Sequence, residues 1–136
     1  MPYRRNKDLS NCAAQFKLMI DDYYYLHVYL WKDKQSMYDA TYLDPPYGGC
    51  YIGMSRMISV DTGLPKKEPP KYGEIHIPMD RIGAGVWAHE LMHFMLDWMD
   101  LFKLDPLENA EPLCKMAGEI TRKFWVKFYG VFKEGE

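Results

Sequence analysis

The sequence of 136 residues lacks the cysteine pattern of a protein that is stapled by disulfides. Its three cysteines, Cys12, Cys50 and Cys114, are odd in number and widely spaced, and they form no Cys-x-x-Cys pair. A disulfide framework is therefore not expected, and the reducing cytoplasm is the expected compartment. A signal-peptide core is also missing, because Asp21 and Asp22 interrupt the stretch that follows the basic N-terminal residues. No apolar run is long enough to suggest a membrane-spanning helix.

A strong excess of one charge is missing as well. The formal net charge is -2, so no basic field indicates a nucleic-acid partner. Hydrophobic residues make up 48% and charged residues 26% of the chain, a balance that favours a globular protein over a disordered one. A chain of this length has no room for a second independent core, so we expect one domain over residues 1–136.

The pattern of apolar, turn-forming and β-branched residues predicts an α+β fold. A small, mostly antiparallel sheet is expected to pack on helices. Helices are predicted where apolar residues recur at helical spacing, and strands where aromatic and β-branched residues are dense. Because proline is tolerated at strand ends and edges, the segment that stops at Pro78 is predicted to be an edge strand. The expected elements are an N-terminal helix (9–22), strands (23–31, 37–43, 50–60 and 72–78), a surface loop (61–71), and two further helices (80–99 and 107–132).

The residues with the clearest chemical meaning are His89-Glu90-Leu91-Met92-His93, which match the pattern H-E-x-x-H. On a helix, positions i and i+4 lie about 40° apart on one face, so both imidazoles can point at one metal. Zinc lies about 2.0–2.1 Å from each histidine nitrogen. Glu90 is displaced sideways, which suits a carboxylate that reaches the metal-bound water without ligating the metal. The motif predicts a zinc site with His89 and His93 as ligands and Glu90 as the catalytic base.

A third ligand is needed, and the sequence offers several candidates. The metzincin extension is excluded, because Leu96 and Met99 occupy the positions of its glycine and histidine. The downstream carboxylates are Asp105, Glu108 and Glu111. If the small residues of the last helix allow the metal helix to approach closely, Glu111 faces the zinc and Glu108 faces water. The alternative is that Glu111 is only a first-turn glutamate, which the helix dipole favours.

The H-E-x-x-H motif, followed by Glu111 eighteen residues after His93, resembles the gluzincin arrangement of two histidines and a downstream glutamate. Within that group the chain is similar to minimal phage-encoded or ImmA/IrrE-like metallopeptidases. The run 109–114, through Gly118 and Trp125, also resembles a segment of phage zincin-like proteins. The likeness covers roughly residues 10–130. It implies an N-terminal helix, a small sheet, a metal helix and a ligand helix, with one Zn²⁺ ion. It also implies a setting in a bacterial or phage-infected cell.

Further residues are expected to assist the site. Asp97 and Asp100 fall on the histidine face of the helix, where either can accept the second ring N–H of a ligand histidine. They are equally consistent with solvated aspartates at the helix end. His76, or a nearby tyrosine, is a candidate for stabilising the oxyanion, although an exposed strand residue is the alternative. By resemblance to zincins, an extended peptide is expected to add to the predicted edge strand at Glu74, Ile75, His76 and Ile77.

The predicted function is that of a zinc-dependent peptidase acting on a peptide or protein substrate, without a nucleic-acid or membrane partner. Glu90 is expected to take the proton of the zinc-bound water and to pass it to the leaving amine. The alternative is a catalytically silent zincin-fold binding protein, for example a phage-encoded inhibitor of a host protein. A hydrolase of a non-peptide bond is a third hypothesis. Glu90 favours an enzyme, because a binding module has no need of it.

Overall fold

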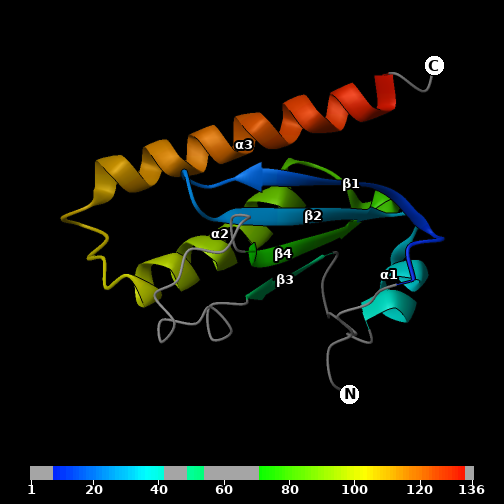
Figure 1. Ribbon diagram of the computed structural model, residues 1–136, viewed down its shortest axis with the longest axis horizontal. Coiled ribbons are helices and arrows are strands. Elements are labelled where there is room, and N and C mark those ends of the chain that lie inside the picture. The colour runs from blue at the N-terminus through cyan, green and yellow to red at the C-terminus, as the bar shows by residue number, and fades with distance from the viewer. Residues whose placement is uncertain (1–7, 42–48, 54–70, 134–136) are drawn as a thin grey trace.

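The computed structural model describes residues 8–41, 49–53 and 71–133 (Figure 1). It confirms the α+β class, with three α-helices and a four-stranded sheet in the described residues. In chain order the elements are β1 (Cys12–Met19), β2 (Tyr25–Trp31), α1 (Lys34–Thr41), β3 (Cys50–Gly53), β4 (Lys71–Pro78), the short 3-10 helix η2 (Met79–Arg81), α2 (Ala84–Leu101) and α3 (Ala110–Lys133). In these parts of the chain, no helix has both the length and the apolar character to cross a membrane.

The sheet is mixed, with the strand order β1-β2-β4-β3. The β1–β2 and β3–β4 pairs are antiparallel, whereas β2 and β4 run parallel. The prediction that residues 72–78 form an edge strand is wrong, because β4 is hydrogen-bonded to β2 on one side and to β3 on the other. Pro78 does not disturb this inner position because it is the last residue of the strand.

The predicted N-terminal helix over residues 9–22 is wrong as well, because this segment forms the strand β1. Ala14, Phe16 and Leu18 alternate with exposed residues, which is the period of a strand with one buried face. Asp21 then closes the turn into β2. Its carboxylate accepts hydrogen bonds from the backbone N–H groups of Tyr23 (2.8 Å) and Tyr24 (2.7 Å). The helical spacing of apolar residues in this segment is therefore a coincidence.

A third correction concerns residues 37–43, which were predicted to form a strand. Residues up to Thr41 belong to the helix α1, and 42–43 lie outside the described residues. Asp33 caps the start of α1, because its carboxylate accepts hydrogen bonds from the N–H (2.8 Å) and the hydroxyl (2.7 Å) of Ser36.

Of the predicted strand 50–60, residues 50–53 form β3 and the rest lies outside the described residues. Of the predicted loop 61–71, Lys71 opens β4 and the other positions are likewise outside.

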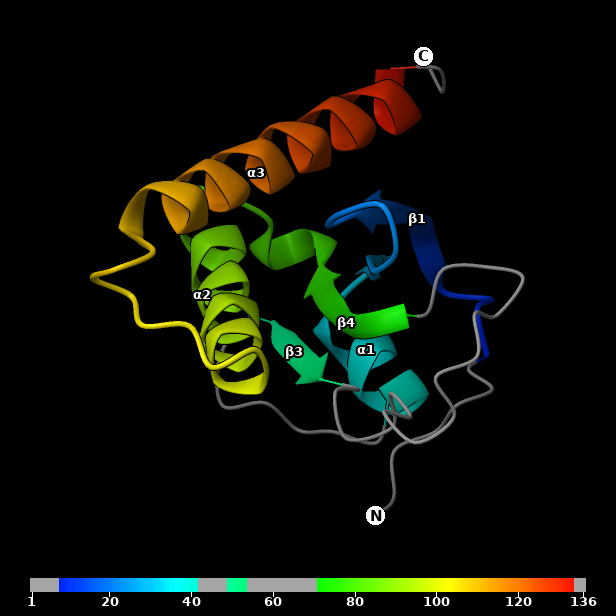
Figure 2. The same cartoon turned by 60° about the vertical axis from the view of Figure 1, so that its left-hand side comes forward.

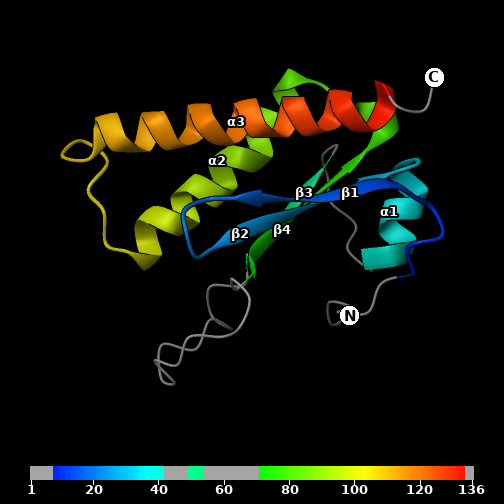
Figure 3. The same ribbon diagram turned by 45° about the horizontal axis from the view of Figure 1, so that its top comes forward.

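Alternating residues of β2 divide the core into two layers. Val28 and Leu30 belong to the main core between the sheet and the helices α2 and α3, which lie together on one face (Figure 2). Tyr29 and Trp31 point to the other face, where α1 packs against them (Figure 3). This arrangement leaves α2 with one side against the sheet, a second side toward α3 and a third side toward solvent.

Candidate metal and catalytic site

Helix α2 carries the H-E-x-x-H motif, as the sequence predicts, and the sheet fixes its rotation. Its side toward the sheet consists of the buried residues Trp87, Leu91, Phe94, Met95 and Trp98. Trp87 also holds the start of α2 to α3, because its ring stacks on Phe124 at 3.9 Å and its indole N–H donates a hydrogen bond to the Thr121 hydroxyl (2.9 Å). With that side packed, His89 and His93 project from the exposed side of the helix.

The two histidine side chains converge on each other. The Nε2 atoms of His89 and His93 lie 3.3 Å apart, and the ring planes are inclined by 72°. This separation is slightly longer than the roughly 2.7–3.2 Å of an ordinary N–H hydrogen bond to oxygen. Two nitrogen ligands on a tetrahedral ion at about 2.0–2.1 Å from each would lie roughly 3.3–3.4 Å apart. The histidine pair therefore fits two adjacent corners of one zinc coordination shell.

Glu90 lies beside this pair but is buried. Its side chain points between α2 and the sheet, where only 2% of its surface is exposed. Its Oε2 atom lies 4.0 Å from Nε2 of His89. Burial raises the pKa of Glu90 to about 6, and the neighbouring His89 partly opposes this shift. A carboxyl group with a pKa near neutrality is suited to accepting and returning a proton.

A glycine allows the chain before β3 to lie close to Glu90. A Cβ atom at Gly49 would lie 3.4 Å from Cγ of Glu90, 3.2 Å from Val86 and 3.0 Å from the carbonyl oxygen of His76. These contacts are tight enough that a larger residue would push the strand away from α2. The close approach of Gly49 is part of what buries the Glu90 carboxyl group.

Asp97 has a partner that the sequence did not indicate. The Tyr51 hydroxyl on β3 donates a hydrogen bond to Oδ2 of Asp97 (2.8 Å), which ties β3 to α2 one turn beyond His93. Burial, followed by this hydrogen bond, raises the pKa of Tyr51 well above its usual range. Asp100 is exposed at the end of α2. The predicted contact of either aspartate with a ligand histidine stays a prediction.

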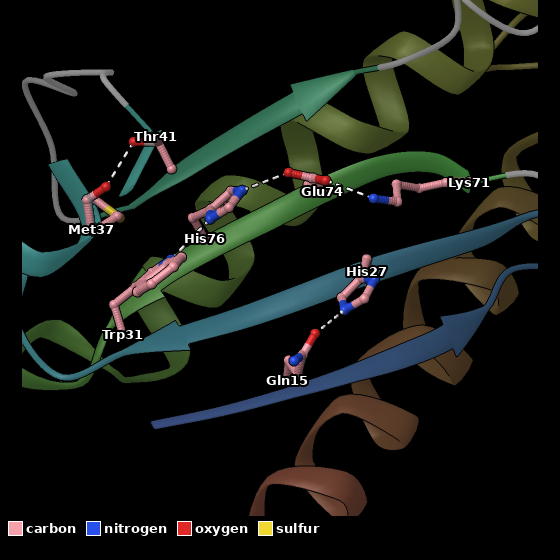
Figure 4. A network of polar contacts seen from close by, with 8 residues as sticks. All are labelled: Gln15, His27, Trp31, Met37, Thr41, Lys71, Glu74 and His76. Carbon is pink, nitrogen blue, oxygen red and sulfur yellow. Dashed lines mark hydrogen bonds and ion pairs between the residues drawn. The ribbon is translucent and has the colours of Figure 1, made fainter. Parts of the chain in front are cut away.

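His76 lies on the face of the sheet opposite α2, so the expectation that it stabilises an oxyanion beside Glu90 is wrong, and the alternative of an exposed strand residue is wrong as well. It alternates with Ile75 and Ile77, which belong to the core under α2, so its ring points to the opposite face of the sheet. Its ring is fully buried, and Trp31 donates an indole N–H hydrogen bond to Nδ1 (2.9 Å; Figure 4). Nε2 therefore carries the ring proton and donates a hydrogen bond to Oε1 of Glu74 (2.9 Å).

The same network accounts for Glu74, one of the residues that were expected to bind a peptide. Glu74 is fully buried, and its second carboxylate oxygen accepts a hydrogen bond from the Lys71 ammonium (2.8 Å; Figure 4). With Ile75 and Ile77 also buried in an inner strand, residues 74–77 do not offer a free edge for strand addition.

The candidate third ligands on the C-terminal side are Asp105, Glu108 and Glu111, and all three are exposed. Within the described residues, no group of three or more His, Cys, Asp or Glu side chains is arranged to hold a metal. The structure thus brings together His89, His93 and Glu90, and it does not bring either glutamate into that group.

Comparison with known proteins adds no family to this picture. No protein-family model, no curated protein and no solved structure matches the chain. The geometry of His89, Glu90 and His93 is therefore the basis for proposing a function.

Proposed function

We propose that this protein is a zinc-dependent peptidase whose metal is held by His89 and His93 and whose general base is Glu90. The observation that carries the proposal is the 3.3 Å approach of the two Nε2 atoms, with a buried carboxyl group 4.0 Å from one of them. Two histidines without a function on a helix would not need to converge in this way. They would also not need a neighbouring carboxyl group that is buried at a cost in desolvation free energy.

When bound, zinc would supply a Lewis acid that polarises the peptide carbonyl and lowers the pKa of a coordinated water toward about 7. The protein supplies the proton transfer. Glu90 accepts the proton of the attacking water and then delivers it to the departing amine nitrogen. The 4.0 Å between Oε2 of Glu90 and Nε2 of His89 would keep the carboxyl group near a metal held by the two histidines, without direct contact between the two side chains.

Glu111 is our proposed third ligand, and the helix arrangement supports it. On α2 the residues toward α3 are Met92, Met95 and Met99, and on α3 the residues toward α2 include Leu113, Cys114 and Ala117. Viewed along α2, the mean direction of its two histidines is about 110° round the helix from the middle of the residues that face α3. Viewed along α3, Glu111 lies about 110° round the helix, in the same sense, from the middle of the residues that face α2. Because the two helices run in roughly opposite directions, these equal rotations point to the same side of the interface (Figures 1 and 3).

The substrate strand is assigned to β3 in this proposal, since β4 is an inner strand. In the described residues β3 has one strand neighbour, β4, and the Tyr51–Asp97 hydrogen bond holds it beside the metal helix. An extended peptide that adds to β3 would pass along the side of α2 that carries Glu90.

Metal content measured on purified wild type and two glutamate variants tests the site. Wild type is expected to hold one zinc ion per chain, Glu111→Gln is expected to lose it, and the matched control Glu108→Gln is expected to keep it. Zinc retained by Glu111→Gln would remove Glu111 from the ligand set.

Hydrolysis tests the enzyme. Glu90→Gln should keep zinc and lose peptide cleavage, and cleavage that survives in this variant would overturn the mechanism. If wild type holds no zinc and cleaves no peptide in a broad library, the alternative of a zincin-fold binding protein replaces the peptidase.

A further inference from the structure

The outer face of α3 carries large apolar side chains that remain in contact with solvent. Tyr129 is 64% exposed and Val126 is 59% exposed. The ring of Trp125 lies 5.8 Å from the ring of Tyr129, so the two rings form one continuous surface. In Figures 1 and 2 the helix forms the upper border of the molecule, with the sheet and α2 beneath it. An exposed apolar surface that is rimmed by polar residues marks an interaction site.

Charge is distributed unequally along α3 and the turn before it. Residues 105–121 contain four carboxylates and one lysine, which gives a net charge of -3. Residues 122–133 contain four basic residues and no acidic one, and Glu134 and Glu136 follow outside the described residues. A second copy of the helix, laid antiparallel, would bring the acidic half of each helix against the basic half of the other. A parallel arrangement would place like charges side by side, which is unfavourable.

The antiparallel arrangement that overlaps the two helices completely also places large side chains opposite small ones. Because α3 covers Ala110–Lys133, the two-fold axis then passes through the helix pair just after position 121. Cys114 lies opposite the partner's Tyr129, and Gly118 lies opposite the partner's Trp125, since the members of each pair are equally far from the axis. These four positions fall within an arc of about 60° on the helix. A Cβ atom at Gly118 would meet nothing within 4 Å, so there is room for an indole ring.

The partner's Tyr129 would also reach an apolar pocket between α2 and α3. The exposed Cys114 and Met92, which is 56% exposed, both line this pocket, whose volume is about 230 Å³. An apolar cavity of about 150 Å³ holds benzene, and methionine side chains adapt their shape to a ring. Met92 lies about 160° round α2 from Glu90, so a helix docked here leaves the side of α2 toward β3 free.

We propose that two copies of this chain associate through α3 as an antiparallel dimer with two-fold symmetry. Tyr129 of each copy is seated against Cys114 and Met92 of the other. Near the axis, Glu119 of each copy lies beside the partner's Arg122, and both residues are exposed in the single chain. The proposal rests on exposed apolar side chains and charges, and it does not depend on the peptidase function.

Charge reversal tests the arrangement of the two helices. The molar mass, measured by light scattering over a concentration series, is expected to rise from the 16.1 kDa of one chain toward twice that value. Arg122→Glu and Glu119→Arg should each weaken association at least about tenfold, because like charges then meet at the axis. An equimolar mixture of the two variants should restore the dimer, since every pair is again of opposite sign. The matched control Lys127→Glu reverses a charge on the opposite side of α3 and should keep the dimer.

Disulfide trapping tests the register. Under mild oxidation Tyr129→Cys should form a covalent dimer with the partner's Cys114, and adding Cys114→Ser to this variant should abolish it. Wild type should form no such link, because the two Cys114 residues would lie about 22 Å apart along the helices, whereas a disulfide needs Cα atoms within about 7 Å. A chain that stays monomeric at every concentration would overturn the proposal. A link through Cys114 in wild type would indicate parallel helices and overturn it as well.

An anionic membrane surface is the other occupant to be tested, because basic and aromatic residues together are typical of helices that lie on such surfaces. Co-sedimentation with phosphatidylglycerol vesicles measures this binding. Vesicle binding by a chain that stays monomeric in solution would assign the face to lipid and overturn the dimer. A concentration-dependent dimer that does not bind the vesicles would support the proposal.

Discussion

The hydroxyl of Tyr51 donates a hydrogen bond to the carboxylate of Asp97 over 2.8 Å, although the two residues are 46 positions apart in the chain. The bond joins the end strand β3 to the helix that carries His93. Asp97 is one helical turn beyond His93, so the contact fixes the distance between this strand and the part of α2 that carries the two histidines.

We therefore expect Tyr51→Phe to lower the free energy of unfolding by about 1–3 kcal/mol, because a partly buried charged group loses its hydrogen bond. The measurement is urea denaturation followed by circular dichroism. Tyr129→Phe is the matched control, since Tyr129 is 64% exposed, and it should change the stability by less than about 0.5 kcal/mol. Equal stabilities of the two variants would contradict the role of the Tyr51 hydroxyl.

Gly73 is expected to be essential for the same contact. A Cβ atom at this position would lie 2.9 Å from the carbonyl oxygen of Ile52 and 2.9 Å from the Tyr51 ring. Because the backbone oxygen has little freedom to move, Gly73→Ala should destabilise the protein by about 1–3 kcal/mol.

The control for this change is Gly118→Ala on helix α3, where a Cβ atom meets nothing within 4 Å. Alanine is favoured over glycine inside a helix by about 0.5–1 kcal/mol, so this variant should be more stable than wild type. Thermal denaturation of both variants checks the opposite signs. A stabilising effect of Gly73→Ala would show that β3 is not packed against β4 as described.

The difference between local and long-range information explains which parts of the site were predictable. His89, Glu90 and His93 lie within five consecutive residues, and helical geometry alone brings the two imidazoles together. The helices α2 and α3 were predictable for the same reason, since each is long and carries a regular apolar pattern. No local pattern links Tyr51 to Asp97, because their contact depends on where β3 enters the sheet.

The incorrect predictions for residues 9–22 and 72–78 have the same physical cause, because strand pairing between distant segments decided the structure there. Phe16 has apolar neighbours at helical spacing, but the alternation of the segment around it matches a strand, and pairing with β2 decides between the two. The inner position of β4 depends on partners that precede it in the sequence, β2 and β3. The orientation of His76 was contained in the sequence, because Ile75 and Ile77 on either side of it must face the core.

The cysteines should differ strongly in reactivity. Burial, together with the negative charges of Glu90 and Glu74, raises the pKa of Cys50 to about 12. A raised pKa keeps the thiol protonated and unreactive at pH 8, since only the thiolate attacks an alkylating reagent. Cys114 is exposed. We expect iodoacetamide at pH 8 to label Cys114 first and Cys50 only after denaturation, as peptide mass spectrometry can establish. Labelling of Cys50 as fast as Cys114 in the folded protein would contradict the position of the Cys50 thiol beside Glu90.

Zinc should stabilise the folded chain through the two histidines. A ligand that binds only the folded state adds about 2.7 kcal/mol at a hundredfold excess over its Kd, which corresponds to a rise of several degrees in the melting temperature. We expect this rise for wild type and for Glu90→Gln, and we expect a chelator to reverse it. His93→Ala should show no rise, because one histidine of the pair is gone.

The control for nonspecific binding to imidazole is His27→Gln, since His27 lies on β2 and is hydrogen-bonded to Gln15 at 2.9 Å, away from the motif. This variant should respond to zinc as wild type does. If His93→Ala is stabilised as much as wild type, zinc binds elsewhere, and the 3.3 Å approach of the two Nε2 atoms reflects only contact between neighbouring side chains on a helix.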